Sequence, residues 1–305
     1  MIESELSPKI LLVDDAPENI RMLRNLLKED ARLLFATSGS EALTTARAEQ
    51  PDLILLDVLM PGMDGYEVCR HLKSHAETQG IPVIFVTGLT EETDESRGLE
   101  LGAIDYITKP FAPGIVRMRV QNHLALRRVT RELQQANAEL KRLATTDTLT
   151  GVSNRRHFFD QVADEIDRMR RYRHSASMFM LDLDHFKRLN DTHGHDMGDR
   201  ALAAVAREVR QLLRGHDLFG RMGGEEFAGF LPETNVDAAF IVCERLREGI
   251  AEIALTAGGK PVRITASIGV SAVEFEDDTP EAALKRADEA MYAVKSNGRD
   301  GVRRG

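Results

Sequence analysis

Three short, continuous apolar runs in the first third of the chain constrain its fold most strongly. They cover residues 9–15, 52–57 and 82–87, and each ends in acidic or hydroxyl side chains. Segments with the apolar spacing of helices lie between them. Apolar runs without alternation are typical of strands buried on both faces, and buried strands that alternate with helices indicate a parallel α/β sheet. Sites in such sheets lie at the carboxyl ends of the strands.

Polar residues that can bind a metal ion and react with phosphorus fall at these strand ends. They are Asp14, Asp15, Asp57, Thr87 and Lys109. Three clustered carboxylates repel one another unless a cation neutralises them, which predicts one Mg²⁺ held by the three acids. With the metal bound, one carboxylate can act as a nucleophile toward phosphorus. The alternative is a flavodoxin-like domain with an inert acidic rim.

Residues from about 8 to 125 resemble the receiver domain of two-component response regulators. The motif Leu-Asp-Val-Leu-Met-Pro-Gly-Met-Asp-Gly at 56–65 contains the matching phosphoacceptor, Asp57. The resemblance implies a flavodoxin-like, doubly wound fold and a cis bond between Lys109 and Pro110, since the cis penalty is small before proline. It also implies roles for the other matching positions: metal-holding acids Asp14 and Asp15, the hydroxyl of Thr87, the cation Lys109 and the rotating aromatic Tyr106.

A second constraint lies at 218–231, where Gly223-Gly224 joins two short strand-like runs and precedes Glu225-Glu226. Glycine adopts the positive φ of tight hairpin turns at little cost, so the motif predicts a hairpin. The turn has no side chains, so a bulky ligand can approach its backbone, and Glu225 places a hard oxygen ligand for Mg²⁺ beside it. Taken alone, the motif also fits an ordinary surface hairpin with solvated acids.

The apolar run 176–183 predicts a buried strand that delivers Asp182 to the rim of a second sheet. Lys187, Asn190 and Asp199 follow it. Acids for a divalent metal, Lys for phosphate and Asn or Asp for a base edge together indicate a nucleotide site. Each of these signals is weak on its own; a strand-end Asp, for example, is more often a helix cap than a metal ligand.

Residues 147–305 resemble the GGDEF family of diguanylate cyclases, in its Gly-Gly-Glu-Glu-Phe form. Ordered matches extend over residues 147–151, 182–190, 194–199, 221–227, 267–270 and 287–299. The resemblance implies an α/β domain with a mainly antiparallel central sheet, like that of nucleotide cyclases. It implies condensation of two GTP into cyclic di-GMP with loss of pyrophosphate. Each subunit would hold one GTP, so the active site would form when two catalytic domains face each other.

The resemblance also implies roles for single residues. Two Mg²⁺ ions would be held by Asp182, the Leu183 carbonyl and Glu225, while Glu226 is either a further metal contact or a proton acceptor. The substrate-binding residues are Lys187, Lys295 and Arg299 for the triphosphate, Asn190 and Asp199 for guanine, and Gly223 and Gly224 for close backbone approach. The alternatives are a catalytically inactive nucleotide sensor, whose usual mark of lost acids is missing from this sequence, and an interaction scaffold.

Arg214 and Asp217 match the Arg-x-x-Asp inhibitory site of this family, and Arg245 matches its secondary arginine. Arginine can form bidentate hydrogen bonds to guanine O6 and N7, and a carboxylate can accept from the N–H edge of guanine. The resemblance therefore implies product inhibition. The alternative is an i,i+3 surface ion pair worth a few tenths of a kcal/mol.

The connecting segment carries an apolar seam with spacings of 3 and 4 residues, which is the heptad pattern of a coiled coil. The seam consists of Leu126, Val129, Leu133, Ala136, Leu140 and Leu143. A single amphipathic helix lying on one domain is the alternative. We therefore predict a receiver domain at 1–125, a helical coiled-coil stalk at 126–146 and a cyclase domain at 147–305, assembled as a homodimer or tetramer.

The length and the charge of the chain limit its number of domains and the kinds of partner that it can bind. A chain of 305 residues suits two domains, and its net charge of −9 argues against nucleic-acid binding. Cys69 and Cys243 each lie in a helix-like apolar pattern and are expected to be buried thiols. Because no apolar run reaches about 18 residues, we expect no membrane insertion and a cytoplasmic location. The expected partners are GTP, cyclic di-GMP and a cognate histidine kinase or other phosphodonor.

Overall fold

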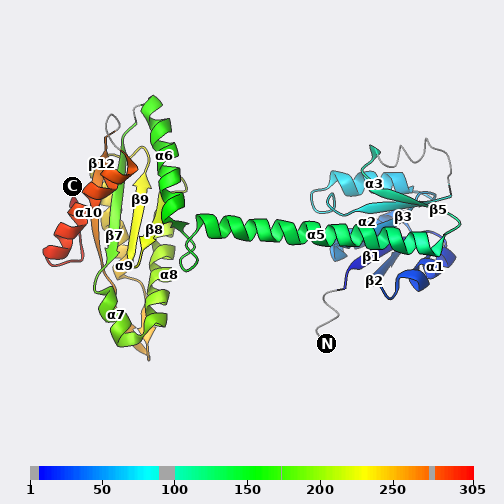
Figure 1. The fold of residues 1–305 in the computed structure, drawn as a ribbon, viewed down its shortest axis with the longest axis horizontal. Coiled ribbons are helices and arrows are strands. Elements are labelled where there is room, and N and C mark those ends of the chain that lie inside the picture. Colours follow the sequence, from blue (N-terminus) through cyan, green and yellow to red (C-terminus); the bar gives the residue numbers. More distant parts are fainter. Residues whose placement is uncertain (1–6, 89–99, 173, 275–278) are drawn as a thin grey trace. The chain divides into compact units, whose positions relative to one another are not determined.

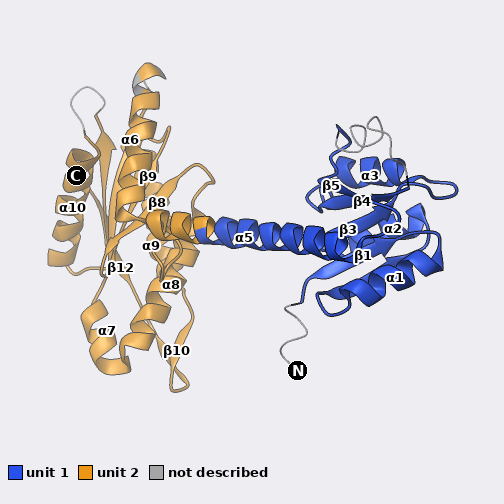
Figure 2. Ribbon diagram, turned by 45° about the vertical axis from the view of Figure 1, so that its right-hand side comes forward, with its two compact units in different colours: residues 1–136 blue, residues 137–305 orange. Residues whose placement is uncertain are grey.

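The computed structural model describes residues 7–88, 100–172, 174–274 and 279–305 (Figure 1). The chain divides into two compact units, residues 1–136 and 137–305 (Figure 2). Helix α5 (Pro113–Thr145) crosses this division without a break. The stalk predicted at 126–146 therefore begins inside α5 and ends one residue after it.

The sheet of the first unit is parallel between all neighbouring strands, which confirms the predicted doubly wound α/β fold. Its strand order in the described part of the chain is β2-β1-β3-β4-β5. The strands are β1 (Lys9–Val13), β2 (Arg32–Ala36), β3 (Leu53–Asp57), β4 (Val83–Thr87) and β5 (Asp105–Thr108). The three apolar runs are thus β1, β3 and β4, and their ends meet at one edge of the sheet.

Helices cover both faces of this sheet, which explains why apolar and polar residues do not alternate along its inner strands. On one face, α1 (Pro17–Leu27) and α5 pack with Leu12 and Leu55. On the other, α2 (Gly39–Glu49) and α3 (Gly65–Ser74) pack with Leu11 and Ile54. A capping box begins α3, because Asp64 accepts from the Glu67 N–H at 2.7 Å while the Glu67 side chain accepts in return.

The sheet of the second unit is mainly antiparallel, as predicted. Its order is β13-β12-β7-β9-β8-β6, and only the outer pairs β12–β13 and β6–β8 are parallel among the described strands. The strands are β6 (Ser153–Asn154), β7 (Ala176–Leu183), β8 (Leu218–Gly223), β9 (Glu226–Leu231), β12 (Ala266–Val273) and β13 (Gly301–Arg304). A separate short hairpin is formed by β10 (Leu255–Ala257) and β11 (Lys260–Val262).

Helices also cover both faces of the second sheet. One face carries α7 (Phe186–His193), α8 (His195–Leu212) and α9 (Val236–Ala251), and the other carries α6 (Arg155–Tyr172) and α10 (Pro280–Ser296). Helix α10 lies in backbone contact with β12, because a Cβ added at Gly269 would lie 1.9 Å from the Ala287 carbonyl oxygen. This close packing fixes α10, which carries Lys295, against the sheet.

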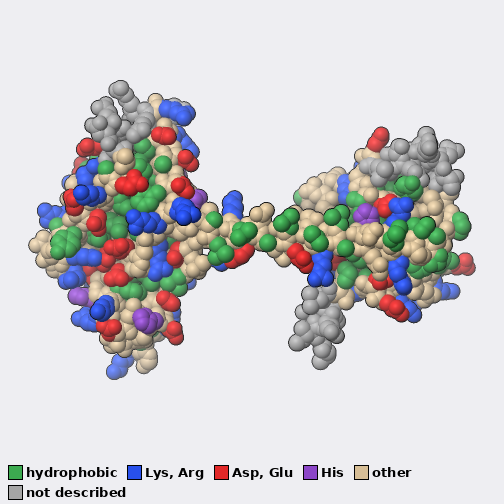
Figure 3. All heavy atoms as spheres, viewed as in Figure 1, with side chains coloured by type: hydrophobic (Ala, Val, Ile, Leu, Met, Phe, Trp, Pro, Cys, Tyr) green, Lys and Arg blue, Asp and Glu red, His purple; other side chains and the backbone are tan. Residues whose placement is uncertain are grey.

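The apolar seam of α5 is exposed in the single chain. Leu126, Val129, Leu133 and Leu140 are each at least 60% exposed, and hydrophobic side chains are visible on the surface of this helix (Figure 3). None of the helices in the described part of the chain has the length and apolar content needed to cross a bilayer. Cys69 and Cys243 are buried free thiols, as predicted, and burial raises the pKa of both.

Candidate functional sites

The strand ends of the first unit bring three carboxylates together. Ligand oxygens of Asp14, Asp15 and Asp57 all lie within 4.8 Å of one another. Asp14 and Asp57 are 1% and 4% exposed, so these two neighbouring carboxylates are poorly hydrated. Because hard carboxylate oxygens at this spacing suit a small divalent cation, the residues present fit the predicted Mg²⁺.

Lys109 compensates the charge of two of these acids. Its Nζ lies 2.9 Å from Asp14 Oδ2 and 2.8 Å from Asp57 Oδ2. Burial raises the pKa of the Asp57 carboxyl, and the hydrogen bond from Lys109 opposes this rise while the charge of Asp14 adds to it. The peptide bond between Lys109 and Pro110 is cis, as predicted.

Thr87 and Tyr106 lie on β4 and β5, which follow β3, the strand of Asp57, in the order of the sheet. Thr87 is buried at the end of β4, where its carbonyl oxygen accepts from the Lys109 N–H at 2.7 Å. Tyr106 is half-buried in β5, with the Arg119 guanidinium 5.5 Å from the centre of its ring. Thr87 and Lys109, which are predicted to supply the hydroxyl and the cation, are therefore joined by a backbone hydrogen bond.

In the second unit, the glycine hairpin forms one residue later than predicted. The turn residues are Gly224 and Glu225, while Gly223 still pairs with Glu226 in the ladder between β8 and β9. The shift arises from a bulge between Arg221 and Gly223, which inserts one residue into β8. Gly223 and Gly224 have φ of 152° and 51°, so positive φ is needed at both, as the motif indicates.

Arg221 supports this turn and is not among the predicted site residues. Its Nη2 donates to the Gly224 carbonyl oxygen at 2.7 Å, and its Nη1 donates to Asp147 Oδ1 at 3.1 Å. Burial raises the pKa of Asp147, but hydrogen bonds from Thr150 and Arg221 outweigh it, so the pKa lies below its usual value. The signal in the sequence was a charged residue inside an otherwise apolar strand, which requires a partner.

Asp182 lies near the end of β7, at the centre of the sheet, and is 4% exposed. It is opposite Glu226 on β9 and Ser267 on β12. Lys295 Nζ lies 2.7 Å from Asp182 Oδ2. Burial raises the pKa of Asp182 to about 6; Lys295 opposes this rise, and the charges of Glu225 and Glu226 add to it.

The backbone brings the other predicted metal ligands next to Asp182. The Leu183 N–H donates to the Glu225 carbonyl oxygen at 3.4 Å, so residue 183 lies beside the turn. Glu225 and Glu226 are half-buried. A buried carboxylate with two acids nearby, compensated by a single lysine, is a site that fits a divalent cation.

The predicted guanine and phosphate residues lie on elements around this strand end. Lys187 and Asn190 are on α7, Asp199 is in the first turns of α8, and Arg299 follows α10. Asn190 and the start of α8 are packed tightly, because a Cβ at Gly198 would lie 1.9 Å from Asn190 Oδ1. Within the described residues, that oxygen is buried and has no hydrogen-bond partner.

The predicted inhibitory residues lie on and beside one loop. The Arg214 N–H donates to Asp217 Oδ2 at 2.8 Å, and Asp217 is 4% exposed, so this carboxylate is turned toward its own loop. The Arg214 side chain is exposed. Arg245 on α9 donates from Nη2 to the Leu212 carbonyl oxygen at 2.8 Å, which brings it next to the same loop.

Two families match this chain. The family described as "Diguanylate cyclase, GGDEF domain" matches residues 144–301, and "Response regulator receiver domain" matches residues 10–121. The response regulator PleD of Caulobacter vibrioides is 28% identical over an alignment that is 449 positions long with its gaps and covers 97% of this chain and 99% of that protein.

Other relatives match a smaller share of this chain. Diguanylate cyclase DgcP of Pseudomonas aeruginosa is 42% identical over 157 residues, which are 52% of this chain and 23% of that protein. The solved coiled coil and GGDEF domain of DgcB from Caulobacter crescentus, in complex with cyclic di-GMP, has a TM-score of 0.56 and 27% identity, covering 62% of this chain and 99% of that one.

Proposed function

Because this chain belongs to the GGDEF family of diguanylate cyclases and carries a receiver domain before the cyclase domain, we propose a phosphorylation-controlled cyclase with product inhibition. The reaction condenses two GTP molecules, one held by each subunit of a cytoplasmic homodimer. The observation that carries the proposal is the buried Asp182 beside the glycine turn, with Lys295 at 2.7 Å. The exposed apolar seam of α5 supports pairing of two chains.

Asp182, the Leu183 carbonyl and Glu225 would hold two Mg²⁺ ions. When bound, the metal lowers the pKa of the attacking 3′-hydroxyl and stabilises charge on the α-phosphate and the leaving pyrophosphate. Glu226, opposite Asp182 in the sheet, would be a further metal contact or a proton acceptor. Gly223 and Gly224 would let the phosphates approach the hairpin backbone.

Lys187, Lys295 and Arg299 would neutralise the triphosphate. Lys295 is paired with Asp182 in the free protein, and its ammonium group would be available to phosphate if Asp182 were compensated by a metal ion instead. Asn190 and Asp199 would bind guanine, with Asp199 accepting from the N1–H and the exocyclic amine. The packing of Asn190 against Gly198 supports this assignment, because it brings Asn190 on α7 close to Asp199 on α8.

The Glu225→Ala variant tests the cyclase assignment. We expect a folded protein that has lost activity by about 10²–10³-fold, because this hairpin acid would stabilise the reacting phosphate through the metal. The assay is incubation with GTP and Mg²⁺ and separation of the nucleotides by chromatography. The matched control is Glu289→Ala, an exposed acid on α10 with a 3.9 Å ion pair, which should leave activity unchanged. Near-normal turnover by Glu225→Ala would exclude the metal role, and an inactive wild type would favour a nucleotide sensor.

Control by phosphorylation would begin at Asp57. Transfer of a phosphoryl group from a histidine kinase or other donor would place new charge beside Thr87 and Lys109. A local charge change of this kind can bias an assembly with two arrangements. Since α5 begins in the receiver unit and continues into the cyclase unit, a change in how receivers pair would reach the cyclase through one helix.

Arg214, Asp217 and Arg245 would bind the guanine bases of the product. The exposed Arg214 side chain and the nearby Arg245 support this role, since both can donate to guanine O6 and N7. Bound product would cross-link catalytic domains and hold the two GTP half-sites apart.

The Arg214→Ala variant separates inhibition from catalysis. It keeps the backbone N–H that binds Asp217, so the loop should stay folded while the product loses its main cation. We expect an active enzyme that accumulates more cyclic di-GMP and binds product about tenfold or more weakly by calorimetry, as for loss of a charged hydrogen-bond donor. Arg207→Ala, an exposed arginine on α8, is the control. Unchanged product affinity in Arg214→Ala would show that the inhibitory assignment is wrong.

A further inference from the structure

The loop that carries Arg299 has an unusual backbone conformation. Gly298, Arg299 and Asp300 have φ of 110°, 66° and 44° in succession. Positive φ is disfavoured in residues with a Cβ, so surrounding contacts must hold Arg299 and Asp300 in this region. The Arg299 N–H donates to the Val294 carbonyl oxygen at 3.1 Å, which fixes the loop on one side of Arg299.

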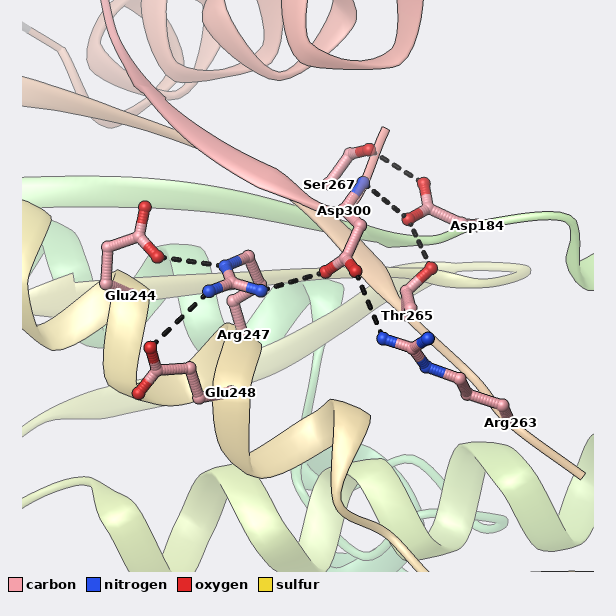
Figure 4. Close-up of polar contacts among 8 residues, drawn as sticks. All are labelled: Asp184, Glu244, Arg247, Glu248, Arg263, Thr265, Ser267 and Asp300. Atoms are coloured by element: carbon pink, nitrogen blue, oxygen red, sulfur yellow. Dashed lines mark hydrogen bonds and ion pairs between the residues drawn. The ribbon is translucent and has the colours of Figure 1, made fainter. Parts of the chain in front are cut away.

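Asp184 holds the other side of this loop. Its carboxylate is 8% exposed and lies between β12 and the loop (Figure 4). Oδ2 accepts from the Asp300 N–H at 3.0 Å and from Thr265 Oγ1 at 2.7 Å. Oδ1 accepts from Ser267 Oγ at 2.7 Å. A buried carboxylate with three donors forms strong, charge-assisted hydrogen bonds, so the Asp300 amide is fixed relative to β12.

The side chain of Asp300 points away from Asp184 and forms a second attachment (Figure 4). Its Oδ1 lies 3.0 Å from Arg247 Nη1, and its Oδ2 lies 3.6 Å from Arg263 Nη2. Arg247 is itself held by Glu244 at 2.9 Å. Asp300, the residue that follows Arg299, is thus fixed through both its N–H group and its side chain.

We infer that Asp184 is a positioning residue for GTP binding, acting through the Asp300 amide to hold Arg299 toward the triphosphate. This inference rests on the proposed role of Arg299. Asp184 is two residues beyond Asp182, so one strand end would supply both the metal-binding carboxylate and the support of the phosphate-binding loop. The metal and the triphosphate would in this way be placed by a common element.

A double-mutant cycle on the full-length protein tests the inference. The variants are Asp184→Ala, Arg299→Ala and the two combined, with initial rates of cyclic di-GMP formation and calorimetric binding of a GTP analogue that cannot cyclise. We expect Asp184→Ala to raise KM and the analogue Kd about tenfold, the loss typical of a charge-assisted hydrogen bond, with a smaller effect on kcat. In the Arg299→Ala background, Asp184→Ala should have no further effect on either constant.

Matched variants distinguish positioning from general stability. Asp184→Asn keeps an oxygen for the Asp300 amide, and Ser267 can rotate to accept, so KM should recover to within about threefold of wild type. Ser271→Ala removes another buried β12 hydroxyl, which donates to the Ala283 carbonyl oxygen at 2.8 Å. This control should lower the melting temperature and leave KM unchanged.

If Asp184→Ala does not fold, the pair Thr265→Val and Ser267→Ala takes its place in the cycle. This pair removes both hydroxyls that orient the carboxylate. We expect it to raise KM as Asp184→Ala would, and to cause no further rise in a protein that already carries Arg299→Ala. Additive effects of Asp184 and Arg299 would overturn the positioning role, as would a wild-type KM in Asp184→Ala. A wild-type KM in Arg299→Ala alone would remove the role of Arg299, and a wild type that makes no cyclic di-GMP would instead refute the proposed function.

Discussion

The Asp182→Asn variant should lose cyclase activity by about 10³-fold and yet be at least as stable as wild type at pH 8. The reason is that the pKa of Asp182 is raised from 3.8 to about 6 in the folded protein. Between these two values the folded state binds more protons than the unfolded state, so stability falls as the pH rises through this window and is constant above it. A shift of this size corresponds to roughly 2–3 kcal/mol of destabilisation above pH 6.

Thermal melts of the metal-free protein at pH 5 and pH 8 measure this effect. The stability difference between Asp182→Asn and wild type should move in favour of the variant by about 1–2 kcal/mol on going to pH 8, since Asn carries no buried charge. The exposed acid Asp288 supplies the control Asp288→Asn, for which no such pH-dependent difference is expected. A variant that melts well below wild type at pH 8 would show that Asp182 serves the fold.

Asp57→Asn should abolish the response to beryllium fluoride, a phosphoryl mimic, while keeping basal cyclase activity. The mimic should activate wild type about tenfold by changing how the receivers pair, because it adds charge where Asp57 and Lys109 lie 2.8 Å apart. Initial rates with and without the mimic measure activation, and light scattering on the same samples measures the assembly state. Equal activation of both proteins would show that control does not act through this residue.

Part of this fold could be predicted because burial leaves a direct pattern in the sequence. The runs that became β1, β3 and β4 are apolar without alternation, since helices cover both faces of their sheet. Their ends then had to meet at one edge, which placed Asp14, Asp15 and Asp57 together. The cis bond at Pro110 followed from a family resemblance and not from a local pattern.

Contacts between distant segments could not be predicted in the same way. The pairing of Lys295 with Asp182 depends on how α10 packs on β12, which apolar spacing does not specify. The bulge before Gly223 moved the turn by one residue, because periodicity reports the buried face and not the ladder register. Asp217 was predicted from its spacing to Arg214, but spacing does not reveal that its carboxylate is used within the loop.

The contact between Lys295 and Asp182 has a consequence for the order in which ligands can bind. If Asp182 is a metal ligand, as proposed, Mg²⁺ alone would have to replace the Lys295 ammonium group, which lies 2.7 Å from this carboxylate, and Lys295 would then be left unpaired in a half-buried position. A nucleotide without metal would attract Lys295 and leave the buried Asp182 uncompensated. With both bound, Asp182 would be compensated by the metal and Lys295 by the triphosphate, so neither charge would be left unpaired. We therefore expect the free site to bind the magnesium complex of GTP more tightly than either component alone.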